Sequence, residues 1–209
     1  ASDFSRVYQF AGTVGVGGTV GVGLTVGVND FSSSAVTAIG NNARVTAGTS
    51  LDLQAQNVSV LEAVNFAGAA GIVGVAGSIN YNRLRNTSNT TIGAGAQISA
   101  LNALISAENE QNLAATTIGL AGGIVGAGVS YTRADLEGGA TTTMGNGATV
   151  TTRSGNLDVV AKQRFRMSVD GLAGAGGAVA GQAAVSEIEE DSDATVALGT
   201  RLAAEHPET

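Results

Sequence analysis

The sequence contains no cysteine, no tryptophan, one proline and one histidine among its 209 residues. Without cysteine there are no disulfides, no thiolate catalysis and no cysteine-based zinc sites. With Pro207 as the only proline and no Gly-X-Y period, a collagen triple helix is excluded. The only histidine, His206, lies in the C-terminal tail without a buried Ser and Asp beside it, so we expect no catalytic triad.

Aromatic residues make up only 4% of the sequence, although 44% of the residues are hydrophobic. A core must therefore be built from Val, Ile, Leu and Ala. The net charge is −7, and the few arginines are scattered along the chain. The sequence has neither the basic footprint of a nucleic-acid-binding protein nor the polybasic cluster that anionic lipid attracts. We expect no nucleic-acid partner.

Charge is missing altogether from four long stretches that recur at a nearly fixed spacing: residues 7–29, 63–82, 111–132 and 171–186. A common phrase follows each stretch, and its glycines are Gly40, Gly93, Gly145 and Gly199. A period of about 53 residues indicates stacked repeats of one supersecondary unit. The sequence predicts one elongated segment over residues 1–209, with repeats near 5–57, 58–110, 111–163 and a truncated 164–209. We expect it to be a fragment of a longer protein.

The uncharged stretches are long enough to span a bilayer, but their pattern is that of a strand. In residues 13–28 every second residue is Val or Leu, apart from Gly18, and the residues between them are Gly or Thr. A period of two is typical of β-strands, and glycine disfavours a helix. No Lys/Arg asymmetry flanks the stretches. We therefore expect strands and no membrane-spanning helix.

Many short strands, tight turns and a repeat predict an all-β fold of the β-solenoid type. We expect each period to hold two or three coils, so that eight coils form a rod of roughly 40 Å. We expect the aliphatic residues of each strand, including Val129 and Val150, to face inward. The small residues between 13 and 27 then form a flat outward strip. Glycine there either suits lateral packing against another chain or simply permits tight packing or a bend.

No residue stands out as catalytic, cofactor-binding or metal-binding. The acidic run 187–193 carries enough carboxylates for Ca²⁺, but the equivalent segments of the other repeats vary in charge, which favours a solvated loop. Asp52 and Asp158 occupy equivalent positions, yet Leu104 or Ile105 replaces them in the second repeat, so we interpret them as surface residues. Asn57, Asn86 and Asn89 begin glycosylation sequons that we expect to be unused.

The repeats resemble two kinds of bacterial protein. Residues 145–151 (Gly-Asn-Gly-Ala-Thr-Val-Thr), which lead to residues 155–159 (Gly-Asn-Leu-Asp-Val), look like the repeats of filamentous haemagglutinin-type exoproteins. Residues 67–77 and 120–129 resemble the alternating glycine-rich repeats of leukotoxin-type filamentous adhesins. The resemblance covers nearly the whole chain. It implies a right-handed parallel β-helix in a large bacterial surface or secreted protein, exported by a type V route and active in adhesion. It supplies no catalytic residues.

Two classes of function remain open at this point. The first is a non-catalytic structural stalk or adhesive segment, located outside the cell or on the bacterial surface. Its partner would be a second copy or a host or bacterial surface ligand. The alternative is a carbohydrate-active β-helix, either a polysaccharide hydrolase or a lyase, which requires a groove lined by acids and aromatics on one face.

Overall fold

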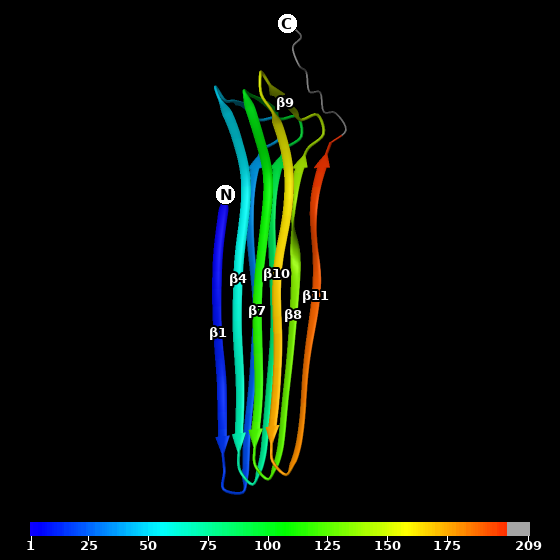
Figure 1. Ribbon diagram of the computed structural model, residues 1–209. Helices are drawn as coiled ribbons and strands as arrows, with labels where there is room; N and C mark the ends of the chain where they lie inside the picture. Colours follow the sequence, from blue (N-terminus) through cyan, green and yellow to red (C-terminus); the bar gives the residue numbers. More distant parts are fainter. Residues whose placement is uncertain (200–209) are drawn as a thin grey trace.

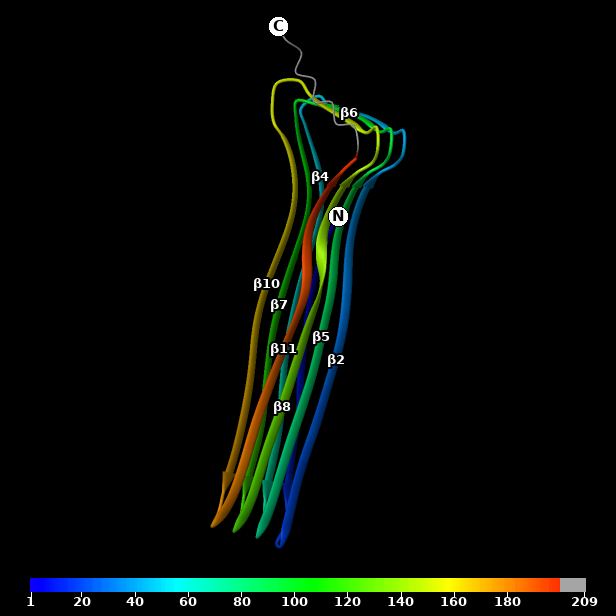
Figure 2. The ribbon, with the colours of Figure 1, turned by 90° about the vertical axis from the view of Figure 1, so that its right-hand side faces the viewer.

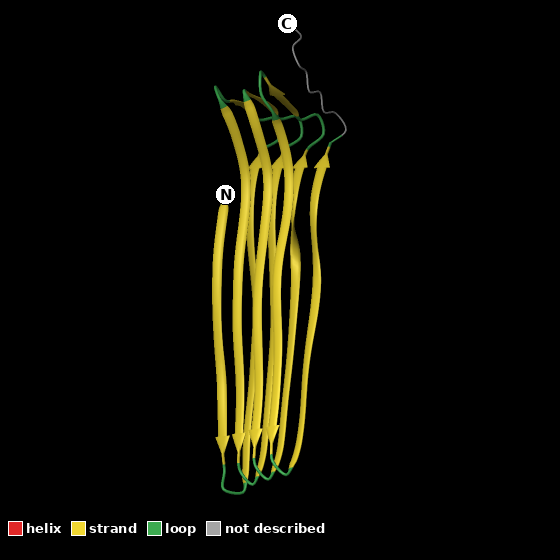
Figure 3. Cartoon of the chain, in the orientation of Figure 1, coloured by secondary structure: helices red, strands yellow, loops and turns green. Residues whose placement is uncertain are grey.

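The computed structural model describes residues 1–199, which form β-strands and turns without any helix (Figure 3). All strand pairs are parallel. The predicted all-β fold is therefore confirmed, and residues 1–199 contain no helix suited to crossing a membrane. The strands are β1 (Ser2–Val16), β2 (Val20–Ile39), β3 (Arg44–Thr46), β4 (Ser50–Ala70), β5 (Val73–Ile92), β6 (Gln97–Ala100), β7 (Asn102–Gly122), β8 (Val125–Met144), β9 (Thr149–Thr152), β10 (Leu157–Gly176) and β11 (Val179–Leu198).

The strands form three stacked parallel sheets. We name them sheet A (β1-β4-β7-β10), sheet B (β2-β5-β8-β11) and sheet C (β3-β6-β9). The chain runs down sheet A, turns, returns along sheet B and crosses through sheet C before it starts the next layer (Figure 1). Figures 1 and 2 together show that it advances as a right-handed coil. The molecule is a parallel β-solenoid whose sheets A and B form the two faces of a blade.

One period of the sequence makes one coil, so the expectation of two or three coils is wrong. Val20 pairs with Val73 and Val73 pairs with Val125, which are separations of one full period. Two strands of 20 and 21 residues, each roughly 66 Å long, account for most of the residues of one period. Each uncharged stretch holds the end of one strand and the beginning of the next, joined by a turn at residues 17–19, 71–72, 123–124 or 177–178. We call this end of the blade the turn end.

The opposite end, which sheet C closes, contains a hydrophobic core. Its buried residues come from the common phrase and its neighbours: Ile92, Ala96, Ile98, Ala103, Ile105, Met144, Ala148 and Val150. Val150 is only 3% exposed, as predicted. The phrase also makes the corner, because Asn42, Gly95 and Gly147 adopt positive φ at equivalent positions. That conformation at the third residue suits a type II turn, which takes Gly or Asn there. The phrase recurs because every coil needs the same corner and the same core.

At the turn end the inside and the outside are the reverse of the prediction. Gly21, Gly23 and Gly27 of β2 face inward and are buried, while the Val and Leu residues between them are exposed. Val129, expected inside, is 50% exposed. The reason is steric: a Cβ at Gly23 would lie 2.0 Å from the carbonyl oxygen of Gly68 on sheet A. The two sheets approach so closely that only very small side chains fit between them.

Between the two ends the interior is largely polar. Asn57, Asn65, Asn80 and Gln111 point inward and are buried, beside a small cluster around Leu61 and Leu84. Several inward side chains donate hydrogen bonds to main-chain carbonyls of the opposite sheet. They include Asn65 Nδ2 to Ile79 O (2.7 Å), Thr90 Oγ1 to Ser106 O (2.6 Å) and Thr25 Oγ1 to Phe66 O (2.6 Å). These bonds join sheets A and B where apolar packing is sparse.

Candidate functional site

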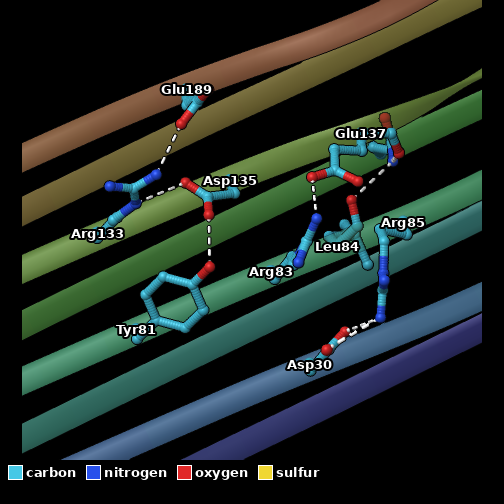
Figure 4. A network of polar contacts seen from close by, with 10 residues as sticks. Asp30, Tyr81, Arg83, Leu84, Arg85, Arg133, Asp135, Glu137 and Glu189 are labelled. Atoms are coloured by element: carbon cyan, nitrogen blue, oxygen red, sulfur yellow. Dashed lines mark hydrogen bonds and ion pairs between the residues drawn. The ribbon is translucent and has the colours of Figure 1, made fainter.

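The densest group of interacting charged side chains lies on the outer face of sheet B, midway along the strands (Figure 4). Most of these contacts join a residue of one coil to a residue of the next. The members come from all four strands of the sheet: Asp30 on β2, Tyr81, Arg83 and Arg85 on β5, Arg133, Asp135 and Glu137 on β8, and Glu187 and Glu189 on β11. We call this group the charge network.

Asp135 is at the centre of the charge network and is only 6% exposed. It accepts a hydrogen bond from the Tyr81 hydroxyl at 2.6 Å and one from Arg133 Nε at 3.0 Å. The bond to Asp135 raises the pKa of the Tyr81 hydroxyl above its ordinary value. Partial burial and the negative charge of Asp135 raise this pKa further, against the opposing effect of Arg83 and Arg133. The Arg133 guanidinium also lies 6.0 Å from the centre of the Tyr81 ring. One contact from the preceding coil, from Tyr81, and one from the same strand, from Arg133, thus hold this buried carboxylate.

The arginines of the charge network also form ion pairs with acids of adjacent coils. Arg133 Nη2 lies 2.7 Å from Glu189 Oε2 in the next coil, and Arg85 donates to Asp30 of the preceding coil at 2.7 and 2.9 Å. Arg83 forms an ion pair with Glu137. Hydrogen bonds to Glu137 and Asp135 raise the pKa values of Arg83 and Arg133 respectively, so both stay cationic. The arrangement binds coil to coil and leaves no unpaired base among these side chains.

The segments predicted to be solvated loops are strands in the structure. The acidic run 187–193 lies within β11, and its equivalents lie within β2, β5 and β8. Their variation in charge has a physical reason, because the column through Asp30, Arg83, Asp135 and Glu189 places Arg83 between two acids. The sequence signal was present once the period was known. It was interpreted as free variation, although it is complementarity between neighbouring coils.

The remaining candidates from the sequence are dispersed. Asp52 and Asp158 are exposed on the outer face of sheet A, with Leu104 between them, as the surface interpretation requires. Asn57 and Asn86 are fully buried, so two of the three sequons are inaccessible in the folded chain. Across residues 1–199 no three His, Asp or Glu side chains gather in a metal-binding group. Independence from metal stays a prediction, and His206 lies outside the described residues.

A hollow of about 640 Å³ adjoins the charge network. Its lining includes Ser32, Ser34, Arg85, Thr87 and Glu137. The two charged groups of this lining are already engaged, because Arg85 contacts Asp30 and Glu137 contacts Arg83. A proton-transfer step needs an acid or base that is free to reach a substrate. Both charged groups of the hollow are therefore held in ion pairs.

Comparisons with models of known protein families, with curated protein sequences and with solved structures found no match to this chain.

Proposed function

We propose that this chain is a non-catalytic structural stalk or adhesive segment of a large bacterial surface or secreted adhesin. The observation that carries the proposal is the use of the charged side chains. The arginines of sheet B bind acids of adjacent coils, and Lys162 on sheet A binds Glu108 of the preceding coil at 2.9 Å. Because these charged side chains pair with one another between coils, they support a function in forming an elongated structure.

In-register stacking supports the same function. Each long strand pairs with its neighbours along nearly its whole length, so every coil contacts only the coils before and after it. Such a body extends by adding layers of roughly 4.8 Å each. The resemblance to filamentous haemagglutinin-type and leukotoxin-type repeats adds the expectation of export by a type V route. We propose the bacterial cell surface or the extracellular medium as its location.

Adhesion through such a segment should depend on multivalency. We expect binding of the single chain to bacterial or host cell surfaces to be too weak to detect, and binding of the same chain displayed densely on beads to be readily measured. The comparison of these two formats, with uncoated beads as the control, tests the proposal. Equal binding in both formats would assign the chain a single high-affinity site and contradict a repetitive, weakly binding surface.

The carbohydrate-active alternative is tested separately. Asp52 and Asp158 point outward from one column of sheet A, two strands apart, and are the acids to replace. The chain is incubated with a panel of plant and bacterial polysaccharides, and released reducing ends and unsaturated uronates are followed. We expect no turnover. Turnover that disappears in Asp158→Asn but persists in Asp191→Asn, which alters an acid of sheet B, would establish the enzyme and refute the passive function.

A further inference from the structure

The outer face of sheet B at the turn end is a continuous aliphatic surface. It comprises the outward residues of four strands: the even-numbered residues 20–26 of β2 and the odd-numbered residues 73–79, 125–131 and 179–185 of β5, β8 and β11. Residues paired across the four strands form a row. All are Val, Leu, Ile, Ala or Gly except Tyr131, and Val20, Leu24 and Val129 are at least half exposed. No charged residue occurs among them. We call this surface the valine face.

The valine face is flat and self-similar. Its rows stack in register through main-chain pairing, so Val20, Val73, Val125 and Val179 are aligned across the coils. The one polar atom, the Tyr131 hydroxyl, donates to Glu187 Oε2 at 2.7 Å. Gly77 has no side chain, which leaves space for Leu24. A Cβ added to residue 77 would lie 3.0 Å from Leu24 Cδ2. A flat face with one satisfied polar group suits packing against another flat sheet.

The size of the valine face is sufficient for a specific pair. The face spans four outward residues along each strand and four strands across, so it measures roughly 26 Å by 19 Å, or about 500 Å². Two such faces together bury about 1,000 Å², which is the lower limit of a specific protein–protein interface. An apolar patch of this size is near the upper end of the largest patch on a typical monomer, and such patches are often functional.

A second copy of this chain fits the valine face. The area of the face meets what a specific pair of proteins needs, and its one polar group is already bonded within the chain. The same patch on two copies is self-complementary under a two-fold axis.

The corresponding region of sheet A does not offer an equal surface. Its outward rows include Arg6, Glu62 and Asp170, and only the three rows nearest the turns are free of charge. Five of the twelve positions in those rows are glycine, against two of sixteen on the valine face, so the apolar surface of sheet A is smaller and interrupted. We propose that two copies of this chain associate through the valine face of sheet B, and that sheet A stays exposed. The proposal does not depend on a role in adhesion.

The test compares two lysine substitutions at equally exposed valines. Val26 on the valine face and Val14 on the outer face of sheet A are both 66% exposed, so a lysine at either position stays in water in the monomer. Sedimentation velocity of the 209-residue chain from about 1 to about 200 µM should show a dimer. Val26→Lys should weaken dimerisation at least about tenfold because it buries an unpaired charge at the interface, and Val14→Lys should leave it within about twofold. Unchanged circular dichroism spectra of both variants show that they fold.

A crosslink locates the interface directly, because the chain has no cysteine of its own. Val75→Cys should be joined to a second copy by a short bismaleimide, and Val14→Cys should not. A chain that is monomeric at every concentration overturns the proposal. So does a dimer that survives Val26→Lys or is lost in Val14→Lys. Binding to phosphatidylcholine vesicles by a chain that does not dimerise would assign the face to lipid and overturn it as well.

Discussion

At the scale of single residues, glycine decides which side of a strand faces inward. Gly23 lies against the backbone of Gly68, whereas Gly77 on the same sheet faces outward and would meet only the flexible end of Leu24. We expect Gly23→Ala to cost about 3 kcal/mol or more, because the added carbon forces the two sheets apart. Gly77→Ala should cost less than about 1 kcal/mol. Urea denaturation measures both, and a larger cost for Gly77→Ala than for Gly23→Ala would mean that the valines face inward, because Gly77 lies on the same side of the sheet as Leu24 and Val129.

A second pair of substitutions tests the same assignment with charge. Val150 is 3% exposed in the core at the closed end, and Val129 is 50% exposed on sheet B. Val150→Asp should destabilise the chain by about 4 kcal/mol or more, because it buries an unpaired carboxylate. Val129→Asp should have a small effect on the thermal midpoint when this is measured at a concentration where the chain is monomeric. A large loss of stability in Val129→Asp would contradict the outward position of this residue.

The sequence predicted the alternation of residues but not its direction. A period of two shows that Val and Gly lie on opposite sides of a strand, and it is silent about which side is buried. The usual preference for buried valine pointed inward. Backbone contact between the sheets at Gly15, Gly21 and Gly23 overrides that preference. At the closed end, where no such contact forces glycine inward, Val150 is buried as the usual preference predicts.

At the scale of the strands, the charge network should make stability depend on alkaline pH. The pKa of Tyr81 is raised, chiefly by its hydrogen bond to Asp135, and the pKa of Tyr131 is raised by its bond to Glu187. A group with a raised folded pKa contributes stability that is present below its unfolded pKa and lost as pH rises through the folded value. We therefore expect the unfolding free energy to fall as pH rises from the ordinary tyrosine pKa of about 10 through the raised pKa values of the folded chain.

Replacement of Tyr81 isolates its contribution to that fall. Tyr81→Phe removes the hydroxyl and should make the alkaline loss of stability shallower, with lower stability near neutral pH because Asp135 loses a donor. Tyr8→Phe, an exposed position on β1, is the matched control. Urea unfolding at several pH values gives both slopes. An unchanged slope in Tyr81→Phe would show that its hydroxyl does not stabilise the fold through Asp135.

Strand boundaries were the least predictable elements. The tight corners at Asn41–Asn42 and at residues 146–147 were recognisable from their residues, and both are turns in the structure. The turn at 17–19 was missed because Gly17 and Gly18 stand among many other glycines and the alternation resumes without a change of parity. Because this turn was missed, the charge network was missed as well. A residue assigned to a loop has no paired residue on a neighbouring strand whose charge it could complement. Pairing partners are a long-range property that one local window does not contain.

At the scale of the whole molecule, one coil per period makes a definite prediction about deletions. Arg164 pairs with Glu110, so removal of residues 111–164 joins Glu110 to Phe165 in register. Strand β5 then faces β11, which places Arg83 opposite Glu189 and Arg85 opposite Asp191. Charge complementarity and corner sequence are both kept, so this variant should fold as a shorter solenoid with a cooperative melt.

Deletion of half that length, residues 111–137, is the matched control. It joins a strand of sheet A directly to the second half of a sheet B strand, omits a turn and removes Glu137, the ion-pair partner of Arg83. We expect this variant to lose its β-sheet circular dichroism signal or to melt without cooperativity, because its coils no longer stack in register. If each period held two coils, the half-length deletion would remove one of them and the rest would still stack. Equal folding of the two variants would therefore reject the single-coil architecture, and failure of the shorter deletion alone would show that the fold can lose a whole coil but not half of one.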